Sequence, residues 1–189
     1  MALDLAAIRM AIEIEKKYLL TAEKYSGLIS ALKGTGAEFA GEDFEENIIF
    51  TGGSLHDKQA VLRLRRIGKK TLLTYKERIP SRSGIKHQIE HETEVGDFDA
   101  ALQIFESLGF TRSLVYEKKR RTWRFDDAEV VLDELPFGLY MEIEGAVEAI
   151  EKAEKLLGIE ALETVHETYS QLTARFGRKN GEIIEARFE

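Results

Sequence analysis

About eight segments of the chain alternate between apolar and charged residues with a period of two, and this alternation constrains the fold more than any other feature. Successive residues of a β-strand point to opposite faces of a sheet, so the pattern is typical of strands with one apolar and one charged face. The segments are 9–19, 43–50, 59–67, 70–79, 86–95, 112–126, 128–135 and 138–145. Short turn sequences at Gly68, Asp126-Asp127 and Pro136–Gly138 predict that neighbouring strands run antiparallel.

Four further segments repeat their apolar residues with the period of a helix, and each is followed or closed by a glycine that can end a helix. These segments are 21–33, 97–108, 146–157 and 167–176. The chain contains two prolines and no stretch rich in Gly, Ser or Pro, so we expect a single domain over residues 1–189. The polar tail 178–189 is expected to be mobile, unless Ile183 and Ile184 dock on the rest of the domain. The predicted class is α+β, dominated by antiparallel sheet.

The charges of the strand segments are sorted by face and by segment. Acids gather on the fifth, seventh and eighth segments and bases on the third, fourth and sixth. The acidic set is Glu13, Glu15, Glu90, Glu92, Glu94, Asp133, Glu142 and Glu144. The basic set is Lys17, Arg63, Arg65, Lys76, Arg78, Lys118, Arg120 and Arg124.

A sheet with one face in water would also alternate in this way. Three features favour an inward-facing charged surface instead. The charged faces are nearly pure Glu, Lys and Arg, acids and bases are separated by strand, and four amphipathic helices are available to cover the apolar faces. Eight antiparallel strands can close into a barrel that holds side chains and one small ligand. We therefore expect an eight-stranded antiparallel β-barrel, flanked by helices, with a charged interior.

A charged interior is tolerable only with a charged guest or abundant water, because unpaired buried charges cost several kcal/mol each as an order of magnitude. Clustered Arg and Lys favour a compact polyanion, and Arg binds phosphate with two parallel hydrogen bonds. Clustered carboxylates favour Mg²⁺, which also bridges phosphate oxygens. Neither GxxxxGK[ST] nor GxGxxG occurs in the sequence. The pattern therefore predicts a binding site for a metal and a polyphosphate.

Composition excludes several other classes of protein. The absence of cysteine excludes disulfide scaffolds, thiolate metal sites and cysteine nucleophiles. The net charge of −7 argues against a dedicated nucleic-acid binder. The first twenty residues carry acids among their apolar positions and lack a basic leading region, so they resemble neither a signal peptide nor a membrane span. We expect a cytoplasmic protein with no membrane partner.

Ordered charge motifs in the chain resemble those of the CYTH superfamily, the triphosphate tunnel enzymes. Glu13-Ile-Glu15-Lys-Lys17 fits the ExExK signature of that superfamily. Further matches follow in order at Leu62–Arg65, Thr74–Lys76, Glu90–Glu94, Leu108–Phe110, Lys118–Arg120, Val131–Asp133 and Glu142–Glu144. The resemblance spans residues 9–145, and six charge motifs in phase make it specific.

The resemblance implies a role for each charged strand position. The residues implied to hold a triphosphate are Lys17, Arg63, Arg65, Lys76, Lys118 and Arg120. The residues implied to position Mg²⁺ or Mn²⁺ are Glu13, Glu15, Glu142 and Glu144, with help from Glu90 and Glu92. Lys17 and Asp133 are the candidate catalytic residues, Asp133 as the group that orients a hydroxyl or a bound metal. The implied chemistry is phosphoryl or nucleotidyl transfer by positioning and charge neutralisation.

Three functions remain open at this point. The first is hydrolysis of inorganic or nucleoside triphosphate, the second is cyclisation of ATP to 3′,5′-cyclic AMP and pyrophosphate, and the third is a non-catalytic polyphosphate-binding module. Thiamine triphosphatases are thought to pair the signature lysine with a tyrosine of the second strand, and the sequence has no tyrosine between Tyr25 and Tyr75. Apolar helix faces could cover either the barrel or a second subunit, so a homodimer is also compatible with the sequence.

Overall fold

The computed structural model describes residues 14–79, 87–125 and 127–189. Within these ranges, eight strands form one continuous sheet in the order β1-β8-β7-β6-β2-β3-β4-β5, and every neighbouring pair is antiparallel. The strands are β1 (Glu15–Leu20), β2 (Glu38–Thr51), β3 (Ala60–Ile67), β4 (Lys70–Ile79), β5 (His87–Val95), β6 (Thr111–Phe125), β7 (Ala128–Leu135) and β8 (Gly138–Gly145). The predicted antiparallel class and all eight predicted strands are confirmed, apart from residues 9–13, which lie outside the described ranges.

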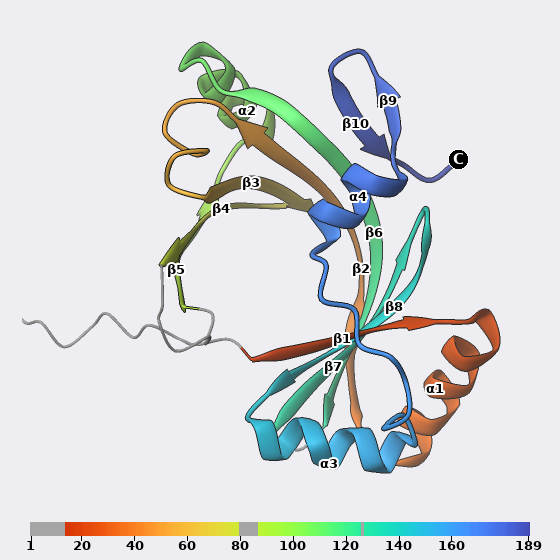
Figure 1. Ribbon diagram of the computed structural model, residues 1–189. Coiled ribbons are helices and arrows are strands. Elements are labelled where there is room, and N and C mark those ends of the chain that lie inside the picture. Colours follow the sequence, from red (N-terminus) through yellow and green to blue (C-terminus); the bar gives the residue numbers. More distant parts are fainter. Residues whose placement is uncertain (1–13, 80–86, 126) are drawn as a thin grey trace, which may run out of the picture.

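The sheet is strongly curved but does not close into a complete barrel. Figure 1 shows the strands wrapping around a concave side, with β5 and β1 at the two ends of the curve. Among the described residues, β1 and β5 are not paired with each other. Part of the free edge of β1 is occupied by a later segment instead, because Tyr18 bridges Thr164 and the Val165 amide donates to the Lys17 carbonyl at 2.7 Å. The expected barrel is therefore a tunnel-like open sheet.

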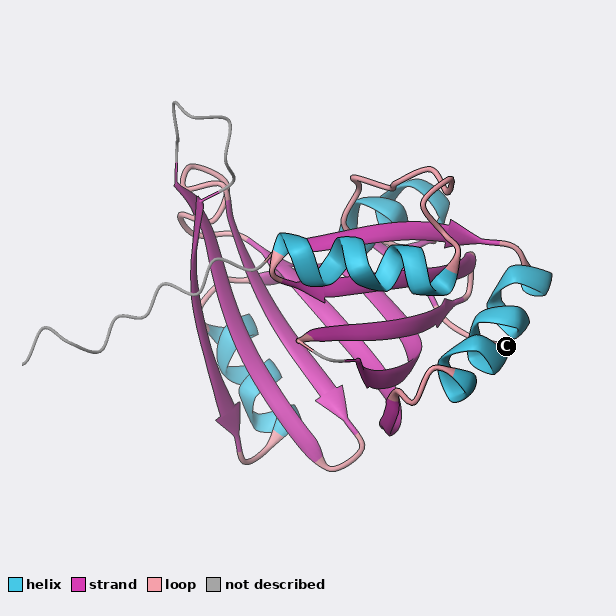
Figure 2. Cartoon of the chain, turned by 90° about the horizontal axis from the view of Figure 1, so that it is seen from below, coloured by secondary structure: helices cyan, strands magenta, loops and turns pink. Residues whose placement is uncertain are grey.

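Three helices cover the convex side of the sheet, where the apolar strand residues lie (Figures 1 and 2). α1 (Ala22–Gly34) and α3 (Val147–Leu157) pack on one half of the sheet over a core that includes Tyr18, Trp123 and Met141. α2 (Phe98–Ser107) packs on the other half, over the core around Leu64. None of the helices in the described part of the chain is long and apolar enough to cross a membrane.

The fourth helix packs differently from the other three. α4 (Tyr169–Phe176) begins at Thr168, whose side chain accepts from the Gln171 amide while the Gln171 side chain accepts from the Thr168 amide. In Figure 1 the chain returns from α3 past β1 to reach α4. Tyr169 and Leu172 then form a third apolar cluster with Ile49, Tyr116 and Tyr140. Of these, Ile49 and Tyr116 share the strand phase of the charged residues, so α4 covers part of the charged side of the sheet.

The polar tail contains two short strands, and the second of them includes Ile183 and Ile184. β9 (Arg178–Asn180) and β10 (Ile183–Ala186) form a hairpin, and β10 pairs in parallel with Leu114–Tyr116 of β6. Beyond the hairpin, Arg187 contacts both Glu46 and Glu117, and the Phe188 amide donates to Glu117. The tail thus lies along the sheet and continues from α4.

Candidate functional site

Charged side chains of the strands gather on the concave side of the sheet, which we call the inner face. Alternation along each strand puts Lys17, Arg63, Lys118 and Glu142 on this face, opposite the apolar residues that the helices cover. Several of these charged residues are buried. They are Lys17, Glu45, Lys118, Asp133 and Glu142. Burial of this many charges is stable only when they are paired, so their partners define the site.

Five residues form a dense ionic network at the middle of the inner face, which we call the central cluster: Glu45, Lys118, Arg120, Asp133 and Glu142. The Lys118 ammonium lies 3.3 Å from Glu45 Oε2 and 3.5 Å from Asp133 Oδ2. Arg120 binds Asp133 with two hydrogen bonds of 2.8 and 2.6 Å, and Nη2 also donates to Glu142 at 2.6 Å. Four strands, β2, β6, β7 and β8, therefore contribute to one network.

Electrostatics of the central cluster favours the ionised state of Asp133 and Glu45. Burial alone would raise the pKa of Asp133, but the neighbouring Lys118 and Arg120 outweigh it and lower the pKa to about 2. The same balance lowers the pKa of Glu45, with Lys118 and Arg65 as the main cations. Burial lowers the pKa of the Lys118 ammonium, and Asp133 opposes that shift. The two cations of the cluster therefore offset most of the charge of its three carboxylates.

A second set of residues lies toward the β5 end of the sheet, and we call it the edge group: Arg63, Thr74, Lys76, Glu90 and Glu92. Arg63 Nη2 donates to Thr74 Oγ1 at 3.2 Å and lies 3.8 Å from Glu92, while Lys76 pairs with Glu90 at 2.7 Å. Arg63 Nε is buried without a hydrogen-bond partner among the described residues. A buried guanidinium nitrogen without an acceptor is an unsatisfied donor that a ligand oxygen would satisfy.

Arg65 connects the two sets. Its Nε donates to Asn47 Oδ1 at 2.9 Å and lies 3.4 Å from Glu45 Oε2, so the guanidinium reaches from β3 to the central cluster. Burial and the neighbouring Arg65 both lower the pKa of Arg63. Two guanidinium groups from alternate positions of one strand therefore repel each other, and an anion between or beside them would relieve that repulsion.

Lys17 occupies the β1 end of the inner face. Its ammonium lies 3.3 Å from Glu142 Oε1, donates to the Glu167 carbonyl at 3.0 Å and lies 4.2 Å from the centre of the Tyr169 ring. The Tyr169 hydroxyl donates to Asp133 Oδ2 at 2.8 Å. Burial, and then the negative charge of Asp133, raise the pKa of Tyr169 well above its usual value. The hydroxyl therefore stays protonated and acts as a donor.

The carboxylates that the sequence assigns to a metal are brought together only in part. Glu15 of β1 lies directly opposite Glu144 of β8, and Lys17 lies opposite Glu142 in the same register. Glu13 lies outside the described residues. No group of three or more His, Asp or Glu side chains close enough to hold an ion occurs in the described ranges. Mg²⁺ is commonly held by one or two carboxylates plus waters and substrate phosphates, and the exposed Glu15–Glu144 pair fits that donor set.

Residues outside the predicted set of site residues also lie on the inner face. Glu45 and Asn47 alternate along β2, so strand parity could have identified them, although their segment shows fewer alternating charges than the others. Thr74 bridges Arg63 and Glu92, and Tyr116 is buried close to Arg63. Tyr169 comes from a helix, and its helical spacing alone predicts an ordinary core residue.

The opposite face of β2 and β3 shows what an ordinary charged surface of this sheet looks like. A hollow of about 480 Å³ there is lined by residues that include Glu42, Glu46, Arg66 and Arg187. Glu46 pairs with Arg66 and Arg187, and Glu42 pairs with Arg121. Arg66 and Arg187 are the cations that line this hollow, whereas the inner face carries six cations from β1, β3, β4 and β6.

Comparisons with known proteins agree with this geometry. The family model described as CYTH domain matches residues 11–175. A curated protein of Methanocaldococcus jannaschii named "Putative adenylate cyclase MJ0240" is 29% identical over 150 residues, which cover 77% of this chain and 83% of that protein. The structure of the PH1012 protein of Pyrococcus horikoshii is 26% identical, with a TM-score of 0.70, over 83% of this chain and 96% of that one. A Hippeastrum structure, "Putative adenylyl cyclase HpAC1", has the same fold at 19% identity, with a TM-score of 0.65 over 86% and 94% of the two chains.

Proposed function

The chain belongs to the CYTH domain family, and on that premise we propose that it is a metal-dependent enzyme that binds a triphosphate on the inner face and hydrolyses it. The observation that carries this proposal is the placement of six cations from four strands on one face of a curved sheet. They are Lys17, Arg63, Arg65, Lys76, Lys118 and Arg120. A linear triphosphate carries charge along its whole length, which matches a row of cations rather than a single anion site.

Binding is an exchange of partners. In the described residues the inner-face cations contact carboxylates of the chain itself, as Arg120 does with Asp133 and Lys76 with Glu90. Phosphate oxygens would replace some of these carboxylates and would supply an acceptor for Arg63 Nε. Because donors are already arranged on rigid strands, little reorganisation is needed when the ligand enters.

Carboxylates at the β1 end of the inner face support the metal requirement that we propose. Glu15 and Glu144, with Glu142 once Lys17 and Arg120 turn to phosphate, would hold Mg²⁺ or Mn²⁺. When bound, such an ion neutralises the charge that develops on the phosphate oxygens. Lys17 is the candidate catalytic cation at the β1 end, and Asp133 holds Lys118 and Arg120 in place.

Two relatives favour a second candidate function on the same site. The M. jannaschii protein is named as an adenylate cyclase, and the Hippeastrum protein is described as an adenylyl cyclase with a dominant triphosphatase activity. Cyclisation of ATP needs the ribose 3′-oxygen at the α-phosphorus, whereas hydrolysis needs a water at a phosphorus of the chain. Both reactions use the same cations, so the inner face accommodates either.

A product assay tests the proposal. The protein is incubated with tripolyphosphate, ATP or thiamine triphosphate in Mg²⁺ or Mn²⁺, and phosphate, pyrophosphate and cyclic AMP are resolved. We expect phosphate from tripolyphosphate or ATP, and cyclic AMP would instead assign the second function.

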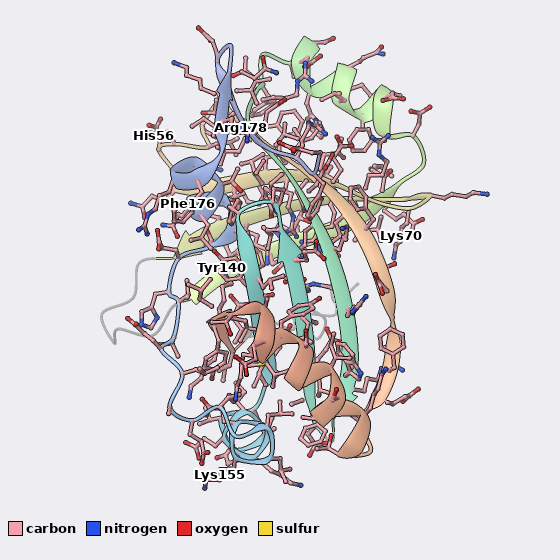
Figure 3. All side chains as sticks on the ribbon, turned by 90° about the vertical axis from the view of Figure 1, so that its right-hand side faces the viewer. His56, Lys70, Tyr140, Lys155, Phe176 and Arg178 are labelled. Carbon is pink, nitrogen blue, oxygen red and sulfur yellow. The ribbon has the colours of Figure 1, made fainter. Side chains whose placement is uncertain are left out.

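A matched pair of variants locates the site. Arg63→Ala should abolish most of the activity, whereas Lys70→Ala, at the exposed β3–β4 turn labelled in Figure 3, should not. Tight binding of tripolyphosphate without any product would leave a binding module.

A further inference from the structure

We propose that Tyr169, the first residue of α4, is a positioning residue that holds Lys17, Lys118 and Asp133 in the arrangement needed for the triphosphate. This inference rests on the proposed function, since it assigns a task at the same site. It also extends the site beyond the sheet, because a residue from the C-terminal part of the chain contributes to it.

Three contacts of one side chain reach three residues of the inner face. The Tyr169 hydroxyl donates to Asp133 Oδ2 at 2.8 Å. The ammonium groups of Lys17 and Lys118 lie 4.2 and 5.2 Å from the centre of its ring. The three partners come from β1, β6 and β7, and Tyr169 is itself buried.

The backbone before α4 fixes Tyr169 relative to Lys17. The Val165 amide donates to the Lys17 carbonyl at 2.7 Å, and the Lys17 ammonium donates to the Glu167 carbonyl at 3.0 Å. Reciprocal capping at Thr168 then sets where the helix begins. Tyr169 therefore cannot shift without disturbing either the edge of β1 or the start of α4.

Two physical effects follow from these contacts. Two ammonium groups that face one ring are stabilised by its electron-rich surface, which offsets part of their mutual repulsion and keeps both beside the ring. The hydroxyl occupies one acceptor position of Asp133, so this carboxylate holds Lys118 and Arg120 less tightly. Phosphate then competes more easily for the two cations.

A purely structural role is the alternative, because Tyr169 also belongs to an apolar cluster with Tyr140 and Leu172. Tyr140, labelled in Figure 3, packs edge-to-face against Tyr169 with ring centres 5.5 Å apart. Its ring makes no cation contact among the described residues. Tyr140→Phe is therefore a matched control that changes the same cluster and leaves the ionic network intact.

The test compares Tyr169→Phe, Tyr169→Leu and Tyr140→Phe for tripolyphosphate turnover, for calorimetric binding of tripolyphosphate without metal, and for thermal unfolding. Tyr169→Phe keeps the ring and loses the hydroxyl, so we expect KM and the dissociation constant to rise by about tenfold with kcat nearly unchanged, the size of one hydrogen bond to a charged group. Tyr169→Leu also removes the ring from Lys17, so kcat should fall as well. Tyr140→Phe should match the wild type in both constants.

The outcomes separate this inference from the proposed function. Kinetic and binding constants of both Tyr169 variants that equal those of Tyr140→Phe, at temperatures where all three are folded, would overturn the positioning role. A wild-type protein that neither binds nor turns over tripolyphosphate would instead overturn the proposed function. The graded pattern, with phenylalanine affecting KM alone and leucine affecting KM and kcat, would support the inference.

Discussion

The central cluster and the edge group carry the same kinds of charge on one sheet, yet their surroundings differ. Lys118 and Asp133 of the central cluster are 2% and 0% exposed at their side chains. Lys76 and Glu92 of the edge group are 25% and 39% exposed. The central residues have several partners each, whereas Arg63 of the edge group has a nitrogen without a partner among the described residues.

This difference indicates that the two groups of residues have different roles on the inner face. A buried ionic network is costly to break, because removing one partner leaves an uncompensated charge. Partly exposed pairs contribute little to stability and exchange partners readily. We infer that the central cluster contributes most to the stability and geometry of the site, whereas the contacts of the edge group exchange at the lowest cost when an anion binds. The predictions below test that difference in roles, from the largest expected effect to the smallest.

Removing Arg120 should cause the largest loss of stability. Arg120→Ala takes away the bidentate partner of buried Asp133 and one partner of Glu142. We expect the free energy of unfolding in urea to fall by about 3 kcal/mol or more, as for one partner of a buried ion pair. Arg63→Ala should lower it less, because the carboxylate that Arg63 faces, Glu92, is 3.8 Å away and partly exposed, and because its loss also relieves repulsion with Arg65. Equal losses for the two variants would remove the distinction between the two regions.

Removing Arg63 should weaken the binding of tripolyphosphate more than it lowers the free energy of unfolding. Arg63→Ala loses a charged donor to phosphate, so we expect KM for tripolyphosphate to rise about 10- to 100-fold. The control is Arg66→Ala, on the opposite face of β3, where Arg66 pairs with Glu46. Steady-state kinetics should leave Arg66→Ala close to the wild type. A similar rise of KM in both variants would indicate that the positive charges of the chain attract anions in general, without a specific binding site on the inner face.

Lowering the pH should reduce the free energy of unfolding, and part of that reduction should come from protonation of Asp133. Its pKa is lowered from 3.8 to about 2 in the folded chain, so its contribution is present above about pH 3.8 and is lost as the pH falls through about 2. The stabilisation involved is about 2 kcal/mol. Urea unfolding should be measured between pH 5 and pH 2, a range chosen to span that window. The free energy of unfolding should fall less steeply with pH for Asp133→Asn than for the wild type. The same pH dependence in both proteins would mean that Lys118 and Arg120 do not stabilise the Asp133 carboxylate as described.

Replacing Glu45 should have the smallest effect, and it should strengthen the binding of tripolyphosphate instead of weakening it. It shares Lys118 and Arg65 with the incoming phosphate, so Glu45→Gln should bind tripolyphosphate several-fold more tightly, by about 1 kcal/mol. Glu46→Gln, the neighbouring residue on the other face, should leave the affinity unchanged. Calorimetry without metal measures both. Weaker binding in Glu45→Gln would show that this carboxylate supports the anion site instead of competing with it.

Sequence periodicity predicted most of the fold. The four helices lie within two residues of their predicted ends, since each has a cap residue or a glycine near its boundary, such as Thr21 before α1 and Gly158 after α3. Closure of the sheet could not be predicted in the same way. Pairing of Tyr18 with Thr164 at the edge of β1 is a contact between segments about 146 positions apart, and alternation carries no information about such partners.

The arrangement of charges on the inner face was predicted unevenly for the same physical reason. Strand parity placed Lys17, Arg63, Lys118 and Asp133 on one face, because the period of two holds wherever a strand is regular. It could not show that Asp133 is enclosed by its partners, or that a tyrosine from α4 reaches it. Contacts of that kind depend on how α4 packs against the sheet.

A crystal structure of the chain with tripolyphosphate and Mn²⁺ tests the central claim most directly, because it locates both the anion and the ion. The account predicts phosphate oxygens within hydrogen-bond distance of Arg63, Arg65 and Lys118, and an anomalous Mn²⁺ signal beside Glu15 and Glu144. Tripolyphosphate bound on the opposite face, near Arg66 and Arg187, with every pair of the central cluster unchanged, would contradict it.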